Sequence, residues 1–239
     1  MSDAALRFER VSKRFGEVAA LEEFSLEVER GEFFGLVGVN GAGKTTLIKC
    51  LLDFCDSDGG RIEIFGISHR VTTARGGLAF LPERFNPPHF LTGRDFLQYM
   101  MRLYRQPYDE LRAREMFATL DLDPAALGKA ARTYSKGMTQ KLGLAACLLS
   151  GKDLYVLDEP TSGLDPKARA LFKQALRGLK QTRRTVFFSS HALADVAEMC
   201  DRMAVLHQGK LRYAGAPAEL AARVDGGDLE QAFLACIEP

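Results

Sequence analysis

The chain has 239 residues, of which 46% are hydrophobic and 26% are charged, and its formal net charge is +1 at pH 7. These values suit a globular protein with one large domain, or with a core that carries a subdomain. Lysine and arginine are scattered among acidic residues, so the chain lacks the charge pattern of strong nucleic-acid binding and we expect no nucleic-acid partner.

The five cysteines show neither CxxC spacing nor a histidine pattern typical of a metal site. They are Cys50, Cys55, Cys147, Cys200 and Cys236, and we interpret them as reduced thiols of a cytosolic protein. No segment approaches the roughly 20 apolar residues that a membrane-spanning helix needs, and residues 1–5 lack a signal-peptide design. If the protein works at a membrane, we therefore expect another chain to span it.

Short strands are predicted at residues 6–9 and 24–28, followed by a Gly-Glu turn and a buried strand at 33–37. This order predicts an antiparallel layer that leads into a parallel core. Further strands are predicted at 61–66 and at 78–81, where Pro82 ends the second.

Residues 38–45 read Gly-Val-Asn-Gly-Ala-Gly-Lys-Thr and lie between the buried strand and the helical apolar spacing of residues 46–52. A glycine-rich turn with a stray lysine is the alternative, but these flanking elements favour a phosphate-binding loop. Its N–H groups and the helix N-terminus would face phosphate oxygens. Lys44 is expected to reach the β- and γ-phosphates of a nucleoside triphosphate, and Thr45 to ligate Mg²⁺. The predicted nucleotide contacts here are Gly38, Asn40, Gly41, Ala42, Gly43, Lys44, Thr45 and Thr46.

From about residue 91 to 149 the pattern becomes helical, with helices predicted at 96–104, 111–120 and 141–149. The core then resumes with a strand at 154–157, a helix at 167–179, a strand at 185–189, a helix at 193–200 and a hairpin at 203–213. Residues 225–228 look like a short flexible link.

Strands that alternate with helices predict an α/β fold with a parallel sheet: a phosphate-loop NTPase (RecA-like) core with an N-terminal antiparallel β layer and an inserted α-helical subdomain. We expect one domain over residues 1–239, with the core at 1–83 and 151–215, the helical subdomain at 84–150 and a short helical tail at 216–239.

The strand at 154–157 ends in two carboxylates, Asp158 and Glu159. An acidic turn at a strand end is the plainer interpretation, but a phosphate loop needs a second partner for its metal. We predict that Asp158 binds Mg²⁺ through water. Because side chains alternate along a strand, Glu159 is expected to point elsewhere, which suits a general base for the attacking water.

Five motifs, in this order and spacing, resemble those of ABC-transporter ATP-binding subunits over nearly the whole chain. They are the loop at 38–45, Tyr-Ser-Lys-Gly-Met at 134–138, Asp-Glu-Pro-Thr at 158–161, Ser-Gly-Leu-Asp at 162–165 and Ser-His at 190–191. The ordered set is specific, because other phosphate-loop enzymes lack the signature at 134–138 and the switch histidine.

The resemblance implies roles for residues outside the loop. Phe15 matches an aromatic that stacks on adenine, the alternative being a core aromatic. Ser135 and Gly137 match residues that contact the γ-phosphate bound to the opposite subunit, and Asp165 one that links the two sites. These roles imply a head-to-tail dimer, homodimeric or pseudo-symmetric, around two ATP molecules. His191 looks like the switch residue that senses the γ-phosphate, the alternative being an ordinary surface histidine. The expected catalytic residues are therefore Lys44, Glu159 and His191.

Two positions depart from the family pattern. Glu83 stands where the family has its lid glutamine; a carboxylate can still ligate Mg²⁺, but it adds negative charge near the γ-phosphate. The expected metal set is Thr45, Glu83 and Asp158. The signature contains Lys136 and Met138 where Gly and Gln are usual, which could alter ATP contact across the dimer.

The Leu-Pro-Glu lid at 81–83, the signature at 134–138 and the segment at 229–234 look most like those of ATP-binding subunits of exporter-type transporters. This resemblance implies a separate membrane permease as partner. It also implies that the protein lies at the cytoplasmic face of the membrane. Residues 84–91 are rich in proline and aromatics, which suits either a groove for a permease helix or subdomain core. Two other functions are possible: a soluble ABC ATPase that drives an assembly or remodelling complex, and an ATP-gated binding switch with negligible hydrolysis, against which Glu159 argues.

Overall fold

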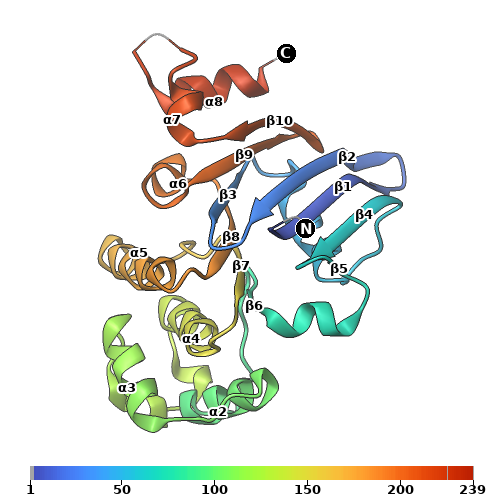
Figure 1. Ribbon diagram of the computed structural model, residues 1–239. Helices are drawn as coiled ribbons and strands as arrows, with labels where there is room; N and C mark the ends of the chain where they lie inside the picture. The colour runs from blue at the N-terminus through green and yellow to red at the C-terminus, as the bar shows by residue number, and fades with distance from the viewer. Residues whose placement is uncertain (1–2, 225, 239) are drawn as a thin grey trace.

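The computed structural model describes residues 3–224 and 226–238, within which two sheets lie side by side (Figure 1). The smaller sheet has the order β2-β1-β4-β5 and is antiparallel throughout. Its strands are β1 (Ala4–Phe15), β2 (Val18–Glu29), β4 (Gly59–Ile64) and β5 (Ile67–Ser68). The predicted antiparallel layer is therefore confirmed.

Strands β1 and β2 are more than twice as long as the sequence indicated. Register shifts interrupt their pairing, one of them between Phe8 and Val11, where Arg10 has a φ of 46°. A bulge of this kind breaks the two-residue alternation. A search for strict alternation therefore finds only the regular central part of each strand.

The larger sheet has the order β10-β9-β3-β8-β7-β6, with parallel pairing from β9 to β6 and an antiparallel β9–β10 hairpin. Its strands are β3 (Phe33–Val37), β6 (Leu78–Leu81), β7 (Leu154–Asp158), β8 (Thr185–Ser190), β9 (Arg202–His207) and β10 (Lys210–Gly215). The predicted parallel core and the final hairpin are both confirmed.

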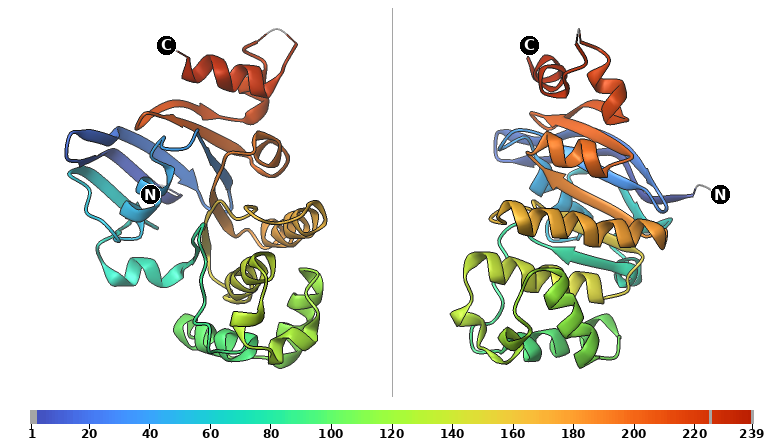
Figure 2. Two further views of the ribbon diagram at one scale, coloured as in Figure 1. Left: turned by 180° about the vertical axis from the view of Figure 1, so that it is seen from behind. Right: turned by 90° about the vertical axis from the view of Figure 1, so that its left-hand side faces the viewer.

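Helices α2 (Gly93–Tyr104), α3 (Glu110–Thr119) and α4 (Lys136–Leu149) gather at one end of the molecule, and α7 (Pro217–Ala221) and α8 (Leu229–Ile237) lie at the other (Figure 2). Between them are α1 (Lys44–Leu51), α5 (Pro166–Gln181) and α6 (Leu193–Met199), while 3₁₀ turns occupy Thr72–Gly77, Pro124–Gly128 and Ala131–Thr133. Of the predicted link at 225–228, Asp225 lies outside the described residues.

Helix α4 begins five residues earlier than the sequence predicted. The Ser135 side chain accepts a hydrogen bond from the backbone N–H of Met138 at 3.2 Å, which is the geometry of an N-cap. Lys136, rather than Lys141, is the first helical residue. The start of the helix was predicted too far along the chain because the signature resembles a glycine-containing loop. In the structure its serine caps the helix, and Gly137 does not interrupt it.

Two hydrophobic clusters pack against opposite faces of the parallel sheet. One cluster joins the sheet to the antiparallel layer and α1, with Phe8 packed 5.7 Å from Phe24 and 6.2 Å from Phe187 between ring centroids. The other joins the sheet to α2 through α6 and α8. Each fully buried phenylalanine contributes about 1.5–3 kcal/mol, so the phosphate loop follows a sheet that is fixed from both sides.

Strand β3 divides its residues between the two clusters, because its side chains alternate. Phe33 and Val37 belong to the cluster on the helical side, and Phe34 and Leu36 to the cluster on the antiparallel side. A Cβ on Gly35 would lie 2.7 Å from Cγ1 of Val196. Helix α6 therefore packs directly onto the backbone of β3.

The aromatic residues of segment 84–91 differ in their surroundings. Phe85 packs edge-on against Phe96 at 5.4 Å between ring centroids, while Phe90 is 75% exposed. Phe85 is thus part of the packing around α2, and Phe90 faces solvent. None of the helices in residues 3–224 and 226–238 is long and apolar enough to cross a membrane.

Candidate functional site

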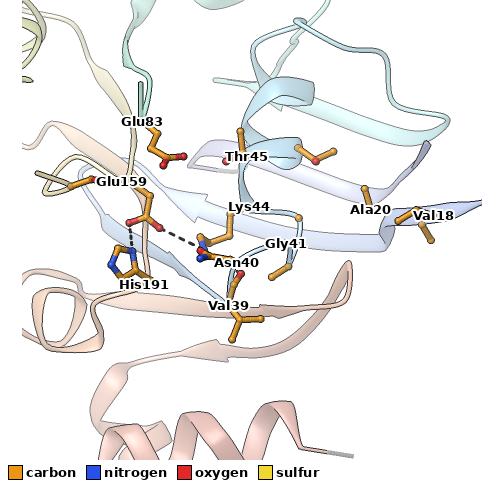
Figure 3. A pocket seen from close by; sticks show the side chains of 15 residues that line it. Val18, Ala20, Val39, Asn40, Gly41, Lys44, Thr45, Glu83, Glu159 and His191 are labelled. Carbon is orange, nitrogen blue, oxygen red and sulfur yellow. Dashed lines mark hydrogen bonds and ion pairs between the residues drawn. The ribbon is translucent and has the colours of Figure 1, made fainter. Parts of the chain in front are cut away.

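A cavity of about 380 Å³ lies at the carboxyl ends of the parallel strands, where α/β sheets commonly bind ligands (Figure 3). Its walls come from the segments that follow β3, β6, β7 and β8, together with the start of β2. The residues that line it are Val18, Ala19, Ala20, Val39, Asn40, Gly41, Ala42, Gly43, Lys44, Thr45, Thr46, Glu83, Glu159, Ser162 and His191. The fold therefore brings together most of the phosphate loop and three of the predicted side chains from distant motifs.

The phosphate loop needs its glycines for steric reasons. Gly43 has a φ of 112° and precedes the first residue of α1, and a Cβ there would lie 2.4 Å from the carbonyl oxygen of Ala20. A Cβ on Gly38 would lie 2.4 Å from the carbonyl oxygen of Leu206. The loop thus passes close to β2 and β9, which leaves its concave side free for a ligand.

The Lys44 side chain is buried within the curve of this loop. Its Nζ donates to the carbonyl oxygen of Gly38 at 2.6 Å and to that of Val39 at 3.5 Å. Gly38 does not itself line the cavity, so its part in the site is to shape the loop and hold Lys44.

Glu159 is the meeting point of three chemical groups (Figure 3). One carboxylate oxygen of Glu159 lies 2.8 Å from Nδ1 of His191, which is hydrogen-bond distance. The other oxygen lies 3.5 Å from Nζ of Lys44 and forms an ion pair with it. The side chains of Glu159 and Lys44 are only 10% and 7% exposed, whereas that of His191 is 66% exposed. The exposed ring of His191 therefore contacts the predicted general base.

The backbone at Glu159 corrects the reason given for its direction. Strand β7 ends at Asp158, and Glu159 has a φ of 48°, so its side chain is directed by a left-handed turn rather than by strand alternation. Such a conformation costs a non-glycine residue roughly 1–2 kcal/mol. It is kept where surrounding contacts fix it, which is common at functional sites.

Asp158 lies beneath the cavity. Its carboxylate Oδ1 accepts a hydrogen bond from the Ser189 hydroxyl at 2.5 Å, and the Thr45 hydroxyl also bonds to it. Burial raises the pKa of Asp158, the nearby carboxylates of Glu83 and Glu159 raise it further, and the two hydroxyls oppose the shift. Among the described residues no ion pair to this carboxylate is formed.

These donors suit Mg²⁺. A buried carboxylate that lacks a cationic partner is costly, and the oxygen atoms of Asp158, Thr45 and Glu83 are ligands that Mg²⁺ prefers. Within the described part of the chain, no three His, Cys, Asp or Glu side chains form a metal cage by themselves. That also fits Mg²⁺, which is usually held by one or two carboxylates together with phosphate oxygens and waters.

Besides Gly38 and Asp158, four predicted site residues lie outside the cavity lining. Phe15 is 53% exposed at the end of β1, so the core alternative for it is wrong; its ring lies 5.4 Å from Nζ of Lys13. Ser135 and Gly137 lie at the start of α4, and Asp165 accepts the Ala168 N–H at 2.8 Å as the N-cap of α5. Ser135, Gly137 and Asp165 therefore do not reach the cavity of their own chain, whereas Phe15 lies three residues before Val18, which lines it.

Sequence reasoning missed several contributors. Val18, Ala19 and Ala20 line the cavity although they precede the phosphate loop by about twenty residues, and a turn after β1 brings them there. Ser189 was predicted only as a strand residue, yet it bonds to both members of the acidic pair: its hydroxyl donates to Asp158 and accepts the Glu159 N–H at 2.9 Å. The register of β7 and β8 places Ser189 beside Asp158, a relation that appears only once the strand order is known.

The comparisons with known proteins agree with this geometry. A family model described as "ABC transporter" matches residues 21–162, more than half of the chain. An uncharacterized ABC transporter ATP-binding protein of Synechocystis is 42% identical over 216 residues, which are 88% of this chain and 60% of that protein. A similar protein of Nostoc is 40% identical, and this chain covers 62% of it. The chain thus spans about three fifths of the length of these two relatives.

Other relatives match over more of their length. The ABC transporter ATP-binding protein NatA of Bacillus subtilis is 31% identical over 98% of this chain and 96% of its own. The Nod factor export ATP-binding protein I of Paraburkholderia xenovorans is 33% identical over 98% of this chain and 78% of its own. A solved ATP-binding subunit of an ABC transporter superposes with a TM-score of 0.85 at 27% identity, over 97% of this chain and 99% of that one.

Proposed function

Because the chain belongs to the ABC transporter family of ATP-binding proteins, we propose that it binds Mg·ATP in the cavity beside the phosphate loop and hydrolyses it. The observation that carries this proposal is the meeting of Lys44, Glu159 and His191, which come from three separate segments. A phosphate-binding cation, a carboxylate base and an imidazole donor can together hold the phosphates and orient the attacking water in the hydrolysis of a phosphoanhydride.

In the proposed complex the triphosphate lies along the loop, where the backbone N–H groups of residues 40–46 and the α1 N-terminus face its oxygens. Lys44 then exchanges its contacts with loop carbonyls for contacts with the β- and γ-phosphates. Phe15 stacks on the adenine at the open side, next to the Val18–Ala20 wall. Its exposed ring lies at the end of β1, three residues before Val18.

Glu159 takes a proton from the water that attacks the γ-phosphorus, and His191 donates a hydrogen bond to a γ-phosphate oxygen. The Glu159 backbone is held by its N–H bond to Ser189, so its carboxylate can change partners without a change of the main chain. Release of Lys44 to the phosphates leaves the carboxylate free to accept the proton.

Thr45 and Asp158, with Glu83 beside them, are the residues that would hold Mg²⁺. A cation bound there would supply positive charge against the phosphate oxygens. The raised pKa of Asp158 follows from its burial, and a cation at this carboxylate would lower it again.

We further propose a head-to-tail dimer. Ser135, Gly137 and Asp165 do not reach the cavity of their own chain, and Ser135 and Asp165 are exposed at helix N-termini. In the dimer they complete the partner's ATP site, so ATP binding closes two chains around two nucleotides.

The proposed cellular role is to drive a separate membrane permease from the cytoplasmic face, in the export direction. The match to a protein named for Nod factor export, over 98% of this chain and 78% of that protein, supports this direction. The exposed Phe90 in segment 84–91 is suited to contact the permease.

ATP hydrolysis is tested with Glu159→Gln, which removes the base but keeps the shape of the side chain. We expect ATP binding to persist, turnover to fall about 10²–10⁴-fold, and a dimer to accumulate with Mg·ATP in size-exclusion chromatography. Glu115→Gln on the exposed surface of α3 is the matched control for loss of one negative charge. Full turnover by Glu159→Gln would exclude Glu159 as the base, and a monomer with saturating Mg·ATP would contradict the dimer.

The partner is identified by affinity purification of tagged Glu159→Gln protein from detergent-solubilised cells with Mg·ATP. A polytopic membrane protein supports the transport role. A soluble complex would move the protein to the assembly or remodelling class and leave its ATPase activity in place.

A further inference from the structure

Asp195 is a buried carboxylate that the proposed hydrolysis does not use. It lies on α6, four residues after His191, and its side chain is only 4% exposed. Nζ of Lys173 lies 2.7 Å from its Oδ1, and Nε of Arg169 lies 3.8 Å from its Oδ2; both come from α5. Because these cations neutralise it, the carboxylate can remain charged inside the protein.

The other partner of Asp195 is part of the segment that carries the proposed base. The Thr161 hydroxyl, also buried, donates to Oδ2 of Asp195 at 3.3 Å. Thr161 follows Glu159 by two residues. One carboxylate therefore connects the segment after β7 to the helix that follows His191.

The hydrogen bond between Thr161 and Asp195 lies next to a strained turn of the backbone at Glu159. Glu159 has a left-handed φ of 48°, and such a conformation persists only if surrounding contacts determine it. Three contacts from three elements fix the segment: the Glu159 N–H bonds to Ser189 on β8, Gln140 on α4 donates to the Pro160 carbonyl at 3.4 Å, and Thr161 bonds to Asp195 on α6. Two of these contacts link the segment to the chain around His191: Ser189 lies two residues before His191, and Asp195 lies four residues after it.

We infer that Asp195 is a positioning residue: through Thr161 and through the start of α6 it keeps the Glu159 carboxylate and the His191 imidazole at hydrogen-bond distance. This inference rests on the proposed ATP hydrolysis. Asp195 is not among the residues that line the cavity, so we expect it to affect turnover and not ATP affinity.

The test is Thr161→Val, which removes the hydroxyl and keeps the shape. We expect kcat to fall on the order of 10-fold, since small displacements of catalytic groups are costly, while KM for ATP and the affinity for a fluorescent ATP analogue stay unchanged. Thr161→Ser restores the hydroxyl and should recover kcat. Thr119→Val on the exposed end of α3 is the matched control. Asp195→Asn should lower kcat in the same way; if it fails to fold because Arg169 loses its ion pair and Lys173 keeps only Glu198, the Thr161 variants decide.

Each outcome has a definite meaning. An unchanged kcat in Thr161→Val overturns the positioning role, and so does a Thr161→Ser variant as slow as Thr161→Val, because the effect would then come from packing of the methyl group. A loss of ATP affinity equal to the loss of kcat would also overturn it. If the unmodified protein does not hydrolyse ATP, the proposed function itself fails, which differs from an active protein that tolerates Thr161→Val.

Discussion

Ser189→Ala tests whether the acidic pair depends on the strand beside it. The serine hydroxyl makes two buried hydrogen bonds, one donated to the Asp158 carboxylate at 2.5 Å and one accepted from the Glu159 N–H at 2.9 Å. A bond to a charged group contributes about 1.5–3 kcal/mol, and an unsatisfied buried N–H costs about 1–3 kcal/mol. With partial relaxation we expect a loss of about 3 kcal/mol in the free energy of unfolding, or roughly 6–12 °C in melting temperature for a chain of this size.

Ser190→Ala is the matched control, because the neighbouring buried hydroxyl accepts only the Ala192 N–H, at 3.0 Å. We expect a loss of about 1 kcal/mol there. Thermal melts of the two variants measure the difference directly. Equal melting temperatures would refute the claim that Ser189 supports both acidic residues.

The same variant has a pH signature. Burial already raises the pKa of Asp158 above that of an unfolded aspartate, and the Ser189 hydrogen bond opposes the shift, so Ser189→Ala should raise the pKa further. A group whose pKa is higher in the folded state favours folding at low pH, and that contribution is lost as pH rises from about 3.9 through the folded-state pKa. Ser189→Ala should therefore destabilise the protein more at neutral than at acidic pH, and the acid limb of ATPase activity should move to higher pH. An acid limb that does not move would contradict this assignment.

Three other substitutions give separate tests. Glu83→Gln removes a charge that raises the pKa of Asp158, so the acid limb of the ATPase profile should move to lower pH, and an unchanged profile and Mg²⁺ dependence would deny Glu83 a role at the metal. Lys44→Ala removes a charge-assisted contact with phosphate worth about 1.5–3 kcal/mol, so the Kd for ATP should rise roughly 10–100-fold in a titration with a fluorescent analogue; unchanged affinity would contradict its role. Gly43→Ala meets the Ala20 carbonyl in addition to its positive φ, whereas Gly41→Ala has a positive φ and open space, so thermal melts should show Gly43→Ala to be less stable by about 1–3 kcal/mol, and equal stability would mean that the loop can move away from β2.

The sequence allowed the fold class and the succession of core strands along the chain to be predicted, because buried parallel strands are continuous apolar runs and the motifs follow them directly. Residues 33–37 and 154–158 are examples: each strand is entirely buried and is followed by a chemical group of the site. Boundaries were less accurate where a polar residue starts a helix, as at Lys136, or where a bulge breaks alternation, as at Arg10.

What could not be predicted depends on contacts between segments distant in sequence. Ser189 reaches Asp158 through the pairing of β7 with β8, and Thr161 reaches Asp195 through the packing of α6. The turn at Glu159 is a different case: the proline that follows it favours an extended conformation, so local rules point to the wrong backbone. Only the surrounding contacts select the left-handed one.

The division of β3 between two hydrophobic clusters has a consequence for which mutations the protein can tolerate. A strand with one solvent face accepts polar substitutions at every second position. In β3, Phe33 and Val37 fill one cluster, Phe34 and Leu36 fill the other, and Gly35 lies against Val196. In a library of random variants selected for ATP binding, polar substitutions should therefore be depleted at all five positions of β3 and not only at alternate ones. The strand that precedes the phosphate loop should tolerate few mutations along its whole length.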